Sequence, residues 1–329
     1  MTAGPAPSPA DVRTLGRSGV PVSRVGFGTA AIGGLFSAVR DDQADAALAA
    51  SWDAGTRYFD TAPHYGTGLA ERRLGTFLRT RPRAEFTVST KVGRLLVPGD
   101  GSAEPEGFHG DPTLVRRRDY SAEGVYRSVA ESLERTGLDS FDILLVHDPD
   151  DHGDEALTGA FPALHRLRAE GAVRAIGAGM NQTGMLARFV RETDLDCVLV
   201  AGRYSLLDWS AAEELLPLCR DRGVGVVVGG VFNSGVLADP RPGSTFDYRP
   251  APAAVLERAL ALRDLCAAYR VPLAAAALQF PLRHPDVAAV LVGARSPEEV
   301  LANDRLARLP LPDALWMELA APDGPGAAR

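Results

Sequence analysis

The feature that most constrains the fold of this chain is an alternation of short apolar segments with amphipathic segments, repeated eight times. Each apolar segment resembles a buried strand, and apolar residues at helical spacing follow it. Strict alternation predicts a parallel sheet covered by helices, and eight units in about 300 residues predict a closed barrel. We therefore expect an α/β fold, a (β/α)8 TIM barrel. The predicted strands span 25–28, 58–60, 86–91, 143–146, 173–179, 197–201, 224–229 and 287–292.

The regions outside the strands are expected to add a hairpin, a long loop and two tails. Residues 13–22 predict an N-terminal hairpin, and the Gly/Pro-rich residues 93–119 predict a functional or disordered loop after the third strand. Residues 1–11 predict a disordered tail and residues 321–329 a flexible one, which leaves 12–320 as a single barrel domain. Helices are predicted over 41–52, 69–78, 121–135 and 163–170, from 210 with Ser210 and Glu213 as a capping box, from 254, and after Ser296.

Charge and cysteine content exclude several classes of partner. A net charge of −7 without a basic stripe argues against nucleic acid, and the short arginine cluster at 116–118 is expected to be a solvated approach to a helix. No apolar run approaches the roughly 18 residues of a membrane span. The cysteines are widely spaced without a metal or redox pattern, which predicts small core residues in a reducing, cytoplasmic compartment. They are Cys197, Cys219 and Cys266.

Ionisable residues stand at the ends of three successive predicted strands. Asp60 ends the second strand, Lys91 the third, and His147 follows the fourth. Neighbouring strand ends of a barrel meet at one rim, and Tyr65 lies in the turn after Asp60. A Lys held charged by an Asp should lower the pKa of a nearby phenol, which could then exchange a proton with a substrate oxygen. Because the set lacks a carbon-directed nucleophile, it suits a carbonyl/alcohol redox step in which a nicotinamide exchanges the hydride.

The segments that carry these residues resemble the tetrad of the aldo-keto reductases. They are Phe-Asp-Thr-Ala-Pro-His-Tyr-Gly, Ser-Thr-Lys-Val-Gly-Arg and Leu-Val-His-Asp-Pro-Asp. The resemblance implies that Tyr65 is the acid/base, Lys91 its pKa modulator, Asp60 the partner of Lys91, and His147 the group that orients the substrate oxygen. Segments 91–94, 177–182 and 201–204 resemble the branch of aldose 1-dehydrogenases that act on L-fucose and L-galactose, which includes pyridoxal 4-dehydrogenase.

The same resemblance implies a nicotinamide cofactor. Many of these reductases stack a Tyr behind the nicotinamide where this chain has Gly229 and Gly230, so the resemblance implies that backbone or Phe232 covers this face. A carboxylate at Glu299 would repel a 2′-phosphate and favours NAD, whereas Arg295 leaves NADP open. Ser296 and Glu299 also fit an N-cap and its capping-box partner. The implied cofactor-binding residues are Thr29, Asp60, Asn181, Gly230, Val231, Gly293, Arg295, Glu299 and Asn303.

These observations predict oxidation of C1 of an L-fucose-like or L-galactose-like aldose to a lactone, with His64 and Phe232 touching the substrate. Three alternatives stay open: an NADPH-dependent reductase of an aldehyde or ketone in a biosynthetic pathway, a pyridoxal dehydrogenase, and a nucleotide-binding regulatory barrel without enzymatic activity. A metal-dependent hydrolase is disfavoured because the histidines lack paired ligand spacing, and no metal is expected. The sequence predicts a small-molecule carbonyl or sugar partner, no nucleic acid, no membrane, and no particular oligomeric state.

Overall fold

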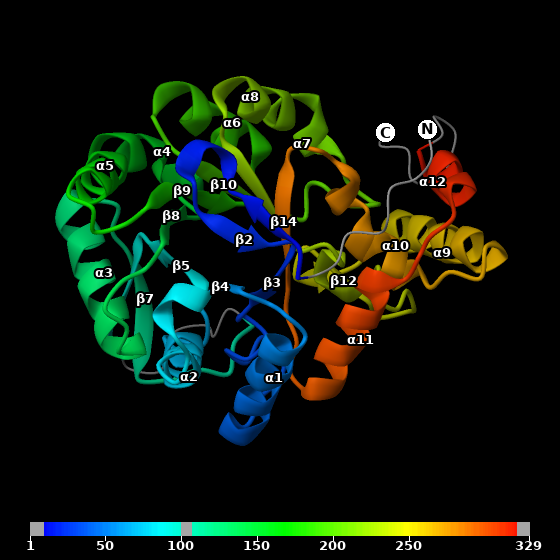
Figure 1. Cartoon of the computed structure of the whole chain (residues 1–329), viewed down its shortest axis with the longest axis horizontal. Coiled ribbons are helices and arrows are strands. Elements are labelled where there is room, and N and C mark those ends of the chain that lie inside the picture. Colours follow the sequence, from blue (N-terminus) through cyan, green and yellow to red (C-terminus); the bar gives the residue numbers. More distant parts are fainter. Residues whose placement is uncertain (1–9, 100–106, 321–329) are drawn as a thin grey trace.

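The computed structural model describes residues 10–99 and 107–320 and confirms the predicted barrel (Figure 1). Eight strands within these residues close the barrel, and each pairs in parallel with both neighbours. In order around it they are β10 (Cys197–Ala201), β11 (Gly225–Gly229), β14 (Val287–Val292), β3 (Val25–Gly28), β4 (Tyr58–Asp60), β5 (Thr87–Val92), β8 (Ile143–His147) and β9 (Ala175–Met180). Of the predicted tails at 1–11 and 321–329, residues 1–9 and 321–329 lie outside the described residues.

Helices surround the barrel strands, as the alternating pattern predicts (Figure 1). The helix that follows β9 was not predicted from the sequence. The helices are α1 (Asp41–Asp53), α2 (Leu69–Leu78), α3 (Ala122–Thr136), α4 (Gly153–Glu155), α5 (Phe161–Ala169), α6 (Thr183–Glu192), α7 (Ser210–Glu213), α8 (Leu215–Arg222), α9 (Ala253–Ala268), α10 (Leu273–Gln279), α11 (Pro297–Arg308) and α12 (Asp313–Leu319). Short 3-10 turns span Gly16–Ser18, Arg83–Glu85, Asp150–His152, Asn233–Gly235 and Pro281–Arg283, and a π turn spans Ala156–Ala160. Among the described residues no helix is long and apolar enough to cross a membrane.

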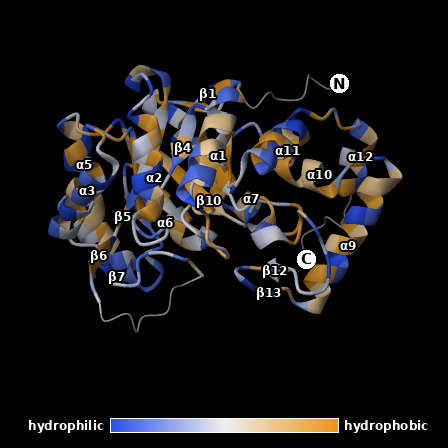
Figure 2. Ribbon diagram, turned by 90° about the horizontal axis from the view of Figure 1, so that it is seen from below, coloured by the Kyte–Doolittle hydropathy of each residue, from blue (hydrophilic) through white to orange (hydrophobic). Residues whose placement is uncertain are grey.

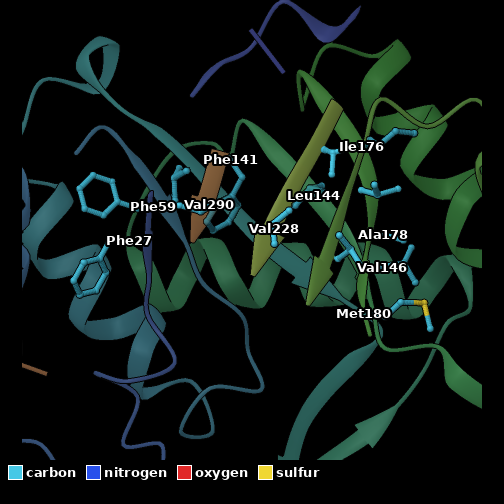
Figure 3. Packing of buried hydrophobic residues seen from close by; sticks show 14 of the residues in the cluster. Phe27, Phe59, Phe141, Leu144, Val146, Ile176, Ala178, Met180, Val228 and Val290 are labelled. Carbon is cyan, nitrogen blue, oxygen red and sulfur yellow. The ribbon is translucent and has the colours of Figure 1, made fainter. Parts of the chain in front are cut away.

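Alternation along the strands separates two layers of core. On β8, Leu144 and Val146 belong to the large cluster between strands and helices, whereas Ile143 and Leu145 belong to a smaller cluster in the barrel interior. Figure 3 shows outward-facing members of the large cluster. Because side chains alternate, His147 has the same parity as Ile143 and Leu145 and therefore faces the barrel axis.

The predicted N-terminal hairpin closes one end of the barrel. It is formed by β1 (Val12–Thr14) and β2 (Pro21–Ser23), which pair antiparallel. Its buried Leu15, Val20 and Val22 complete the interior cluster. Figure 2 shows β1 at the opposite end of the molecule from two further hairpins, β6–β7 and β12–β13.

The long loop predicted after the third strand is a second hairpin. Strands β6 (Arg94–Pro98) and β7 (Leu114–Arg118) pair antiparallel, and residues 100–106 between them lie outside the described residues. Leu95 and Leu96 are buried, so a short continuous apolar run gave this segment a strand character that its glycines and prolines concealed. The arginines at 116–118 lie on β7, and only Asp119 and Tyr120 separate them from Ser121, the N-cap of α3, so the cluster leads into a helix as predicted.

Helix starts followed the predicted caps in part. Ser121 caps α3 by accepting from the backbone N–H of Gly124, and Ser296 caps α11 by accepting from that of Glu299. The capping box at Ser210 is wrong. The Ser210 hydroxyl donates to Asp208 Oδ1 over 2.6 Å, and the N-cap of the short helix α7 is Trp209. A nearer carboxylate therefore competes successfully for this hydroxyl.

Candidate active site

Strand parity brings the four predicted reacting groups to one end of the barrel interior. Asp60 ends β4 and Lys91 lies near the end of the adjacent β5. Lys91 Nζ donates to Asp60 Oδ2 over 2.6 Å and to the carbonyl of Thr61 over 2.9 Å. The other Asp60 oxygen accepts from the Ser89 hydroxyl over 2.7 Å. Lys91 is 1% exposed and Asp60 2%, so the pair is buried and each charge is compensated.

Tyr65 stands directly beside this ion pair. Lys91 Nζ lies 4.7 Å from the centroid of the Tyr65 ring. The His147 ring lies 5.8 Å from the Tyr65 ring at 89°, and Phe108 stacks on the other side at 5.8 Å and 22°. The phenol is thereby fixed between a cation, an imidazole and an apolar ring.

Burial, and after it the charge of Asp60, raises the pKa of Tyr65 well above its ordinary value, whereas Arg94 lowers it. This direction is opposite to the lowering that we expected Lys91 to cause. The physical reason is that Asp60, 2.6 Å from Lys91 Nζ, offsets the field of the Lys91 cation at the phenol. Tyr65 is therefore a neutral phenol at neutral pH, ready to donate a proton, and it becomes a base only as the pH rises.

Burial, followed by the cations Arg94 and Lys91, holds the pKa of His147 well below its ordinary value. A neutral imidazole carries one N–H donor, which is the form that can hold a substrate oxygen without giving up a proton. Its Nδ1 atom is buried without a hydrogen-bond partner among the described residues. The Tyr120 hydroxyl bonds to the backbone carbonyl of His147 over 2.8 Å and keeps this strand end in place.

Arg94, Asp148 and His64 form a polar wall of the site beside the four predicted reacting groups. Arg94, at the start of β6, donates through Nη2 to Asp148 Oδ2 over 2.9 Å. Asp148 follows β8 directly, and its Oδ2 lies 3.4 Å from His147 Nε2. His64 lies within 3.4 Å of Arg94 through its Nδ1, and burial, followed by the charge of Arg94, lowers the pKa of His64 to about 2. Arg116 on β7 donates to the backbone carbonyl of His64, so the β6–β7 hairpin braces the turn that carries Tyr65.

Two adjoining cavities open at this end of the barrel. The reaction cavity contains the reacting groups other than Asp60, which is buried beneath it. The second cavity runs over the ends of β10, β11 and β14 toward the start of α11. Both are lined by Leu35, Asn181, Ala201, Asp247 and Tyr248, which therefore form the boundary between them.

The second cavity contains most of the residues predicted to bind a cofactor. Asn181, Gly230, Val231, Gly293, Arg295 and Glu299 line it. Four predictions differ from the placement in the structure, the first being Asp60, which is buried and lines neither cavity. Thr29 is fully buried and lines neither cavity. Asn303 lines a separate small cavity between α11 and β3. Phe232, predicted to touch substrate, lines the second cavity, whereas His64 lines the reaction cavity as predicted.

The second cavity has the features of a dinucleotide site. Backbone approaches closely where a Cβ on Gly230 would stand 3.0 Å from the nitrogen of Gly202. Asn233 also lines this cavity, and its buried Oδ1 has no hydrogen-bond partner within the described residues, so an acceptor is available for a ligand donor. Arg295 and the start of α11 lie at the far end, where positive potential suits phosphate. A nicotinamide dinucleotide fits these residues.

Glu299 differs in one respect from the isolated carboxylate that we expected. Its Oε2 accepts from the backbone N–H of Arg295 over 2.8 Å, and its Oε1 accepts from the Arg295 guanidinium over 3.1 Å. The predicted N-cap bond at Ser296 is present at 3.4 Å, but the return bond of the capping box goes to Arg295. The Glu299 carboxylate is therefore paired with the Arg295 guanidinium, which could otherwise bind a phosphate.

The fold and the arrangement of the site are those of an oxidoreductase barrel. The aldo/keto reductase family matches residues 24–321. The chain is 47% identical over 311 residues to a D-threo-aldose 1-dehydrogenase from a Pseudomonas species, covering 92% of this chain and 94% of the relative. It is 45% identical over 328 residues to a pyridoxal 4-dehydrogenase from Microbacterium luteolum, covering 93% and 96%.

A solved structure agrees with this relationship. The holo form of an aldo-keto reductase from Bacillus halodurans superposes with a TM-score of 0.76 at 27% identity, covering 96% of this chain and 98% of the other. The chain therefore belongs to the aldo/keto reductase family. It is an NAD(P)-dependent oxidoreductase similar to dehydrogenases of aldoses and pyridoxal.

Proposed function

We propose that this enzyme oxidises C1 of an aldose with the L-fucose or L-galactose configuration to a lactone. The observation that carries this proposal is the polar wall of the reaction cavity, where Arg94 and Asp148 stand next to His147. Charged groups that are held in place can bind the hydroxyls of a sugar, whereas a simple aldehyde has no such hydroxyls to offer them. The similarity to a D-threo-aldose 1-dehydrogenase supports the same substrate class.

The residues act on the anomeric hydroxyl of the cyclic sugar. His147 holds this oxygen by a hydrogen bond and Tyr65 takes its proton, while the hydride leaves C1 as the C1–O bond becomes a carbonyl. A bound nicotinamide dinucleotide supplies the acceptor for that hydride. Lys91 and Asp60 fix the phenol and balance the charge beneath it. One hydride leaves C1 and one proton leaves the anomeric oxygen, so the product is a lactone without addition of water.

The cysteines support a route without a thiol nucleophile. Burial raises the pKa of Cys219 to about 12 and that of Cys266 to about 11, and it raises the pKa of Cys197 further. Neutral, buried thiols are poor nucleophiles, and none of the three lines the reaction cavity. Free cysteines also support our proposal of a reducing, cytoplasmic location.

The reaction is tested by following early product by NMR during oxidation of L-fucose and L-galactose. We expect a lactone that hydrolyses later. Direct formation of the open acid would contradict the proposal, and so would loss of activity in a folded variant with all three cysteines replaced by Ala. Pyridoxal and simple aldehydes are assayed in parallel with NAD and NADP, since they represent the alternatives.

One observation favours pyridoxal as a second candidate substrate. Phe108 stacks on Tyr65 and also contacts the His64 ring edge-on at 5.1 Å, and all three line the reaction cavity, which therefore offers aromatic contacts to an aromatic substrate. The similarity to a pyridoxal 4-dehydrogenase agrees with it. A higher kcat/KM for pyridoxal than for every aldose would identify pyridoxal as the preferred substrate.

We also propose that the enzyme prefers NAD to NADP. Replacing Glu299 with Arg should shift the preference toward NADP by roughly 1 kcal/mol or more, because the change removes a repelling charge and releases Arg295. The measurement is kcat/KM for each cofactor at a fixed sugar concentration. Glu298→Arg is the control, since it makes the same charge change one residue away on the exposed side of α11. A wild-type enzyme that uses NADP as well as NAD would contradict the assignment.

A further inference from the structure

A third hairpin, absent from the sequence predictions, stands over the boundary between the two cavities. Strands β12 (Thr245–Phe246) and β13 (Arg249–Pro250) pair antiparallel and pair with no barrel strand. Asp247 and Tyr248 form the turn with φ values of 48° and 61°. Residues with side chains rarely adopt this left-handed region, and such backbone persists only where its surroundings hold it.

The hairpin tip is held by bonds to two barrel-strand loops. Arg203, just after β10, bonds Asp247 through both guanidinium nitrogens, over 3.0 Å and 2.7 Å. The backbone N–H of Tyr248 donates to the hydroxyl of Ser234, after β11, over 3.0 Å. Thr245 donates to the backbone carbonyl of Ser234 over 2.6 Å. The two-pronged ion pair and the two further hydrogen bonds fix the position of the tip.

Tyr248 projects from this tip toward the reacting groups. It lines the reaction cavity together with Tyr65 and His147, and its ring lies 6.0 Å from that of Phe36 on the far side of the opening. Its side chain is 59% exposed, yet burial, followed by the charge of Asp148, raises the pKa of its hydroxyl. The two facts are compatible because Tyr248 lines both cavities at their boundary. Tyr248 in turn raises the pKa of Tyr65, so the two phenols lie in one electrostatic environment.

We propose that Tyr248 contacts the substrate through its hydroxyl and selects among aldose stereoisomers, with Arg203 and Asp247 as its positioning residues. The inference rests on the proposed function. A sugar whose C1 oxygen lies against Tyr65 and His147 has to place another part of its ring toward the hairpin. Epimers differ in the direction of single hydroxyls, and a donor and acceptor fixed in advance distinguishes these directions.

The first experiment compares Tyr248→Phe and Tyr248→Ala with wild type on L-fucose and its epimers at C2, C3 and C4. We expect the ratio of kcat/KM between the best sugar and its epimers to fall about tenfold in Tyr248→Phe, the scale of one lost hydrogen bond. Dinucleotide affinity, measured by fluorescence quenching without sugar, should stay within about twofold. Tyr126→Phe, an exposed tyrosine on α3, is the matched control and should change neither quantity.

An unchanged ratio in both Tyr248 variants would overturn the proposal. Weaker dinucleotide binding with an unchanged ratio would also overturn it and would assign Tyr248 to the cofactor. If wild type oxidises none of the aldoses, the proposed function fails separately. The Tyr248 proposal is then decided on the substrate that is accepted, for which Tyr248→Phe has to raise KM without weakening dinucleotide binding.

The positioning role is tested by a double-mutant cycle. Arg203→Gln should lower the same stereochemical ratio in the wild-type background and have no further effect on it in the Tyr248→Ala background, because the ion pair acts through the phenol. Arg203→Lys should not restore the ratio, since an ammonium cannot reproduce the two-pronged bond. An effect of Arg203→Gln that adds fully to that of Tyr248→Ala would show that Arg203 acts by another route.

Discussion

Replacing Tyr65 with Phe is expected to lower kcat for the preferred sugar by about two to four powers of ten, the usual scale of acid/base catalysis. The variant loses only the hydroxyl, and the ring keeps its stacking on Phe108 and its contact with His147. Fold and dinucleotide affinity should therefore be retained, and both are measured beside turnover. Retained activity in the folded variant would reject Tyr65 as the proton-transferring group.

The pH profile separates a chemical role of Tyr65 from a structural one. Because burial raises the pKa of Tyr65, the phenolate that oxidation needs increases about tenfold per pH unit below that pKa. Oxidation by wild type should therefore rise with pH above neutrality, whereas reduction of the matching carbonyl, which uses the phenol, should not. The residual oxidation by Tyr65→Phe should lack this rise. The Tyr126→Phe control should reproduce the wild-type profile.

Replacing Lys91 with Met is expected to lower the free energy of unfolding by about 3–5 kcal/mol, because it leaves the Asp60 carboxylate buried without its partner. Lys91 Nζ and Asp60 Oδ2 are 2.6 Å apart, and both side chains are almost fully buried. Denaturant unfolding at neutral pH measures the loss. The variant should also lose turnover, since the neighbour of Tyr65 is gone.

The double variant Asp60→Asn/Lys91→Met should recover much of this stability, because it removes the stranded charge as well as its partner. Arg40→Gln is the control. It breaks the ion pair with Asp42, whose partners are 76% and 72% exposed, and should change the unfolding curve little. A Lys91→Met protein as stable as wild type would mean that Asp60 is neutral or hydrated in its absence.

The barrel and the reacting groups followed from sequence because they depend on periodicity. Two-residue alternation fixes which side chains of β8 face inward, and His147 faces the same side as Ile143 and Leu145. Parallel strand ends then bring it to Lys91 and Asp60. The pattern needed no knowledge of the loops.

The hairpins outside the barrel and the direction of the pKa shift of Tyr65 could not be predicted from periodicity. Two-residue turns are usually predicted from the sequences Asn-Gly or Asp-Gly. In the β12–β13 hairpin the turn residues are Asp247 and Tyr248, and Arg203 from a distant segment holds them in place. The raised pKa of Tyr65 depends on its burial and on how completely Asp60 offsets Lys91, which are properties of the folded state. The sequence shows which groups meet but does not show which electrostatic effect dominates.

The separation of hairpins from barrel strands has a consequence for engineering. Strands β6 and β7 pair only with each other, and so do β12 and β13, while Asp60, Lys91 and His147 are registered within the barrel on β4, β5 and β8. Insertions or randomised residues in these hairpins therefore leave the barrel's hydrogen-bond ladder intact. Libraries in these hairpins that keep Arg94 and Arg116 can thus search for new sugars while the barrel strands that carry Asp60, Lys91 and His147 stay unchanged.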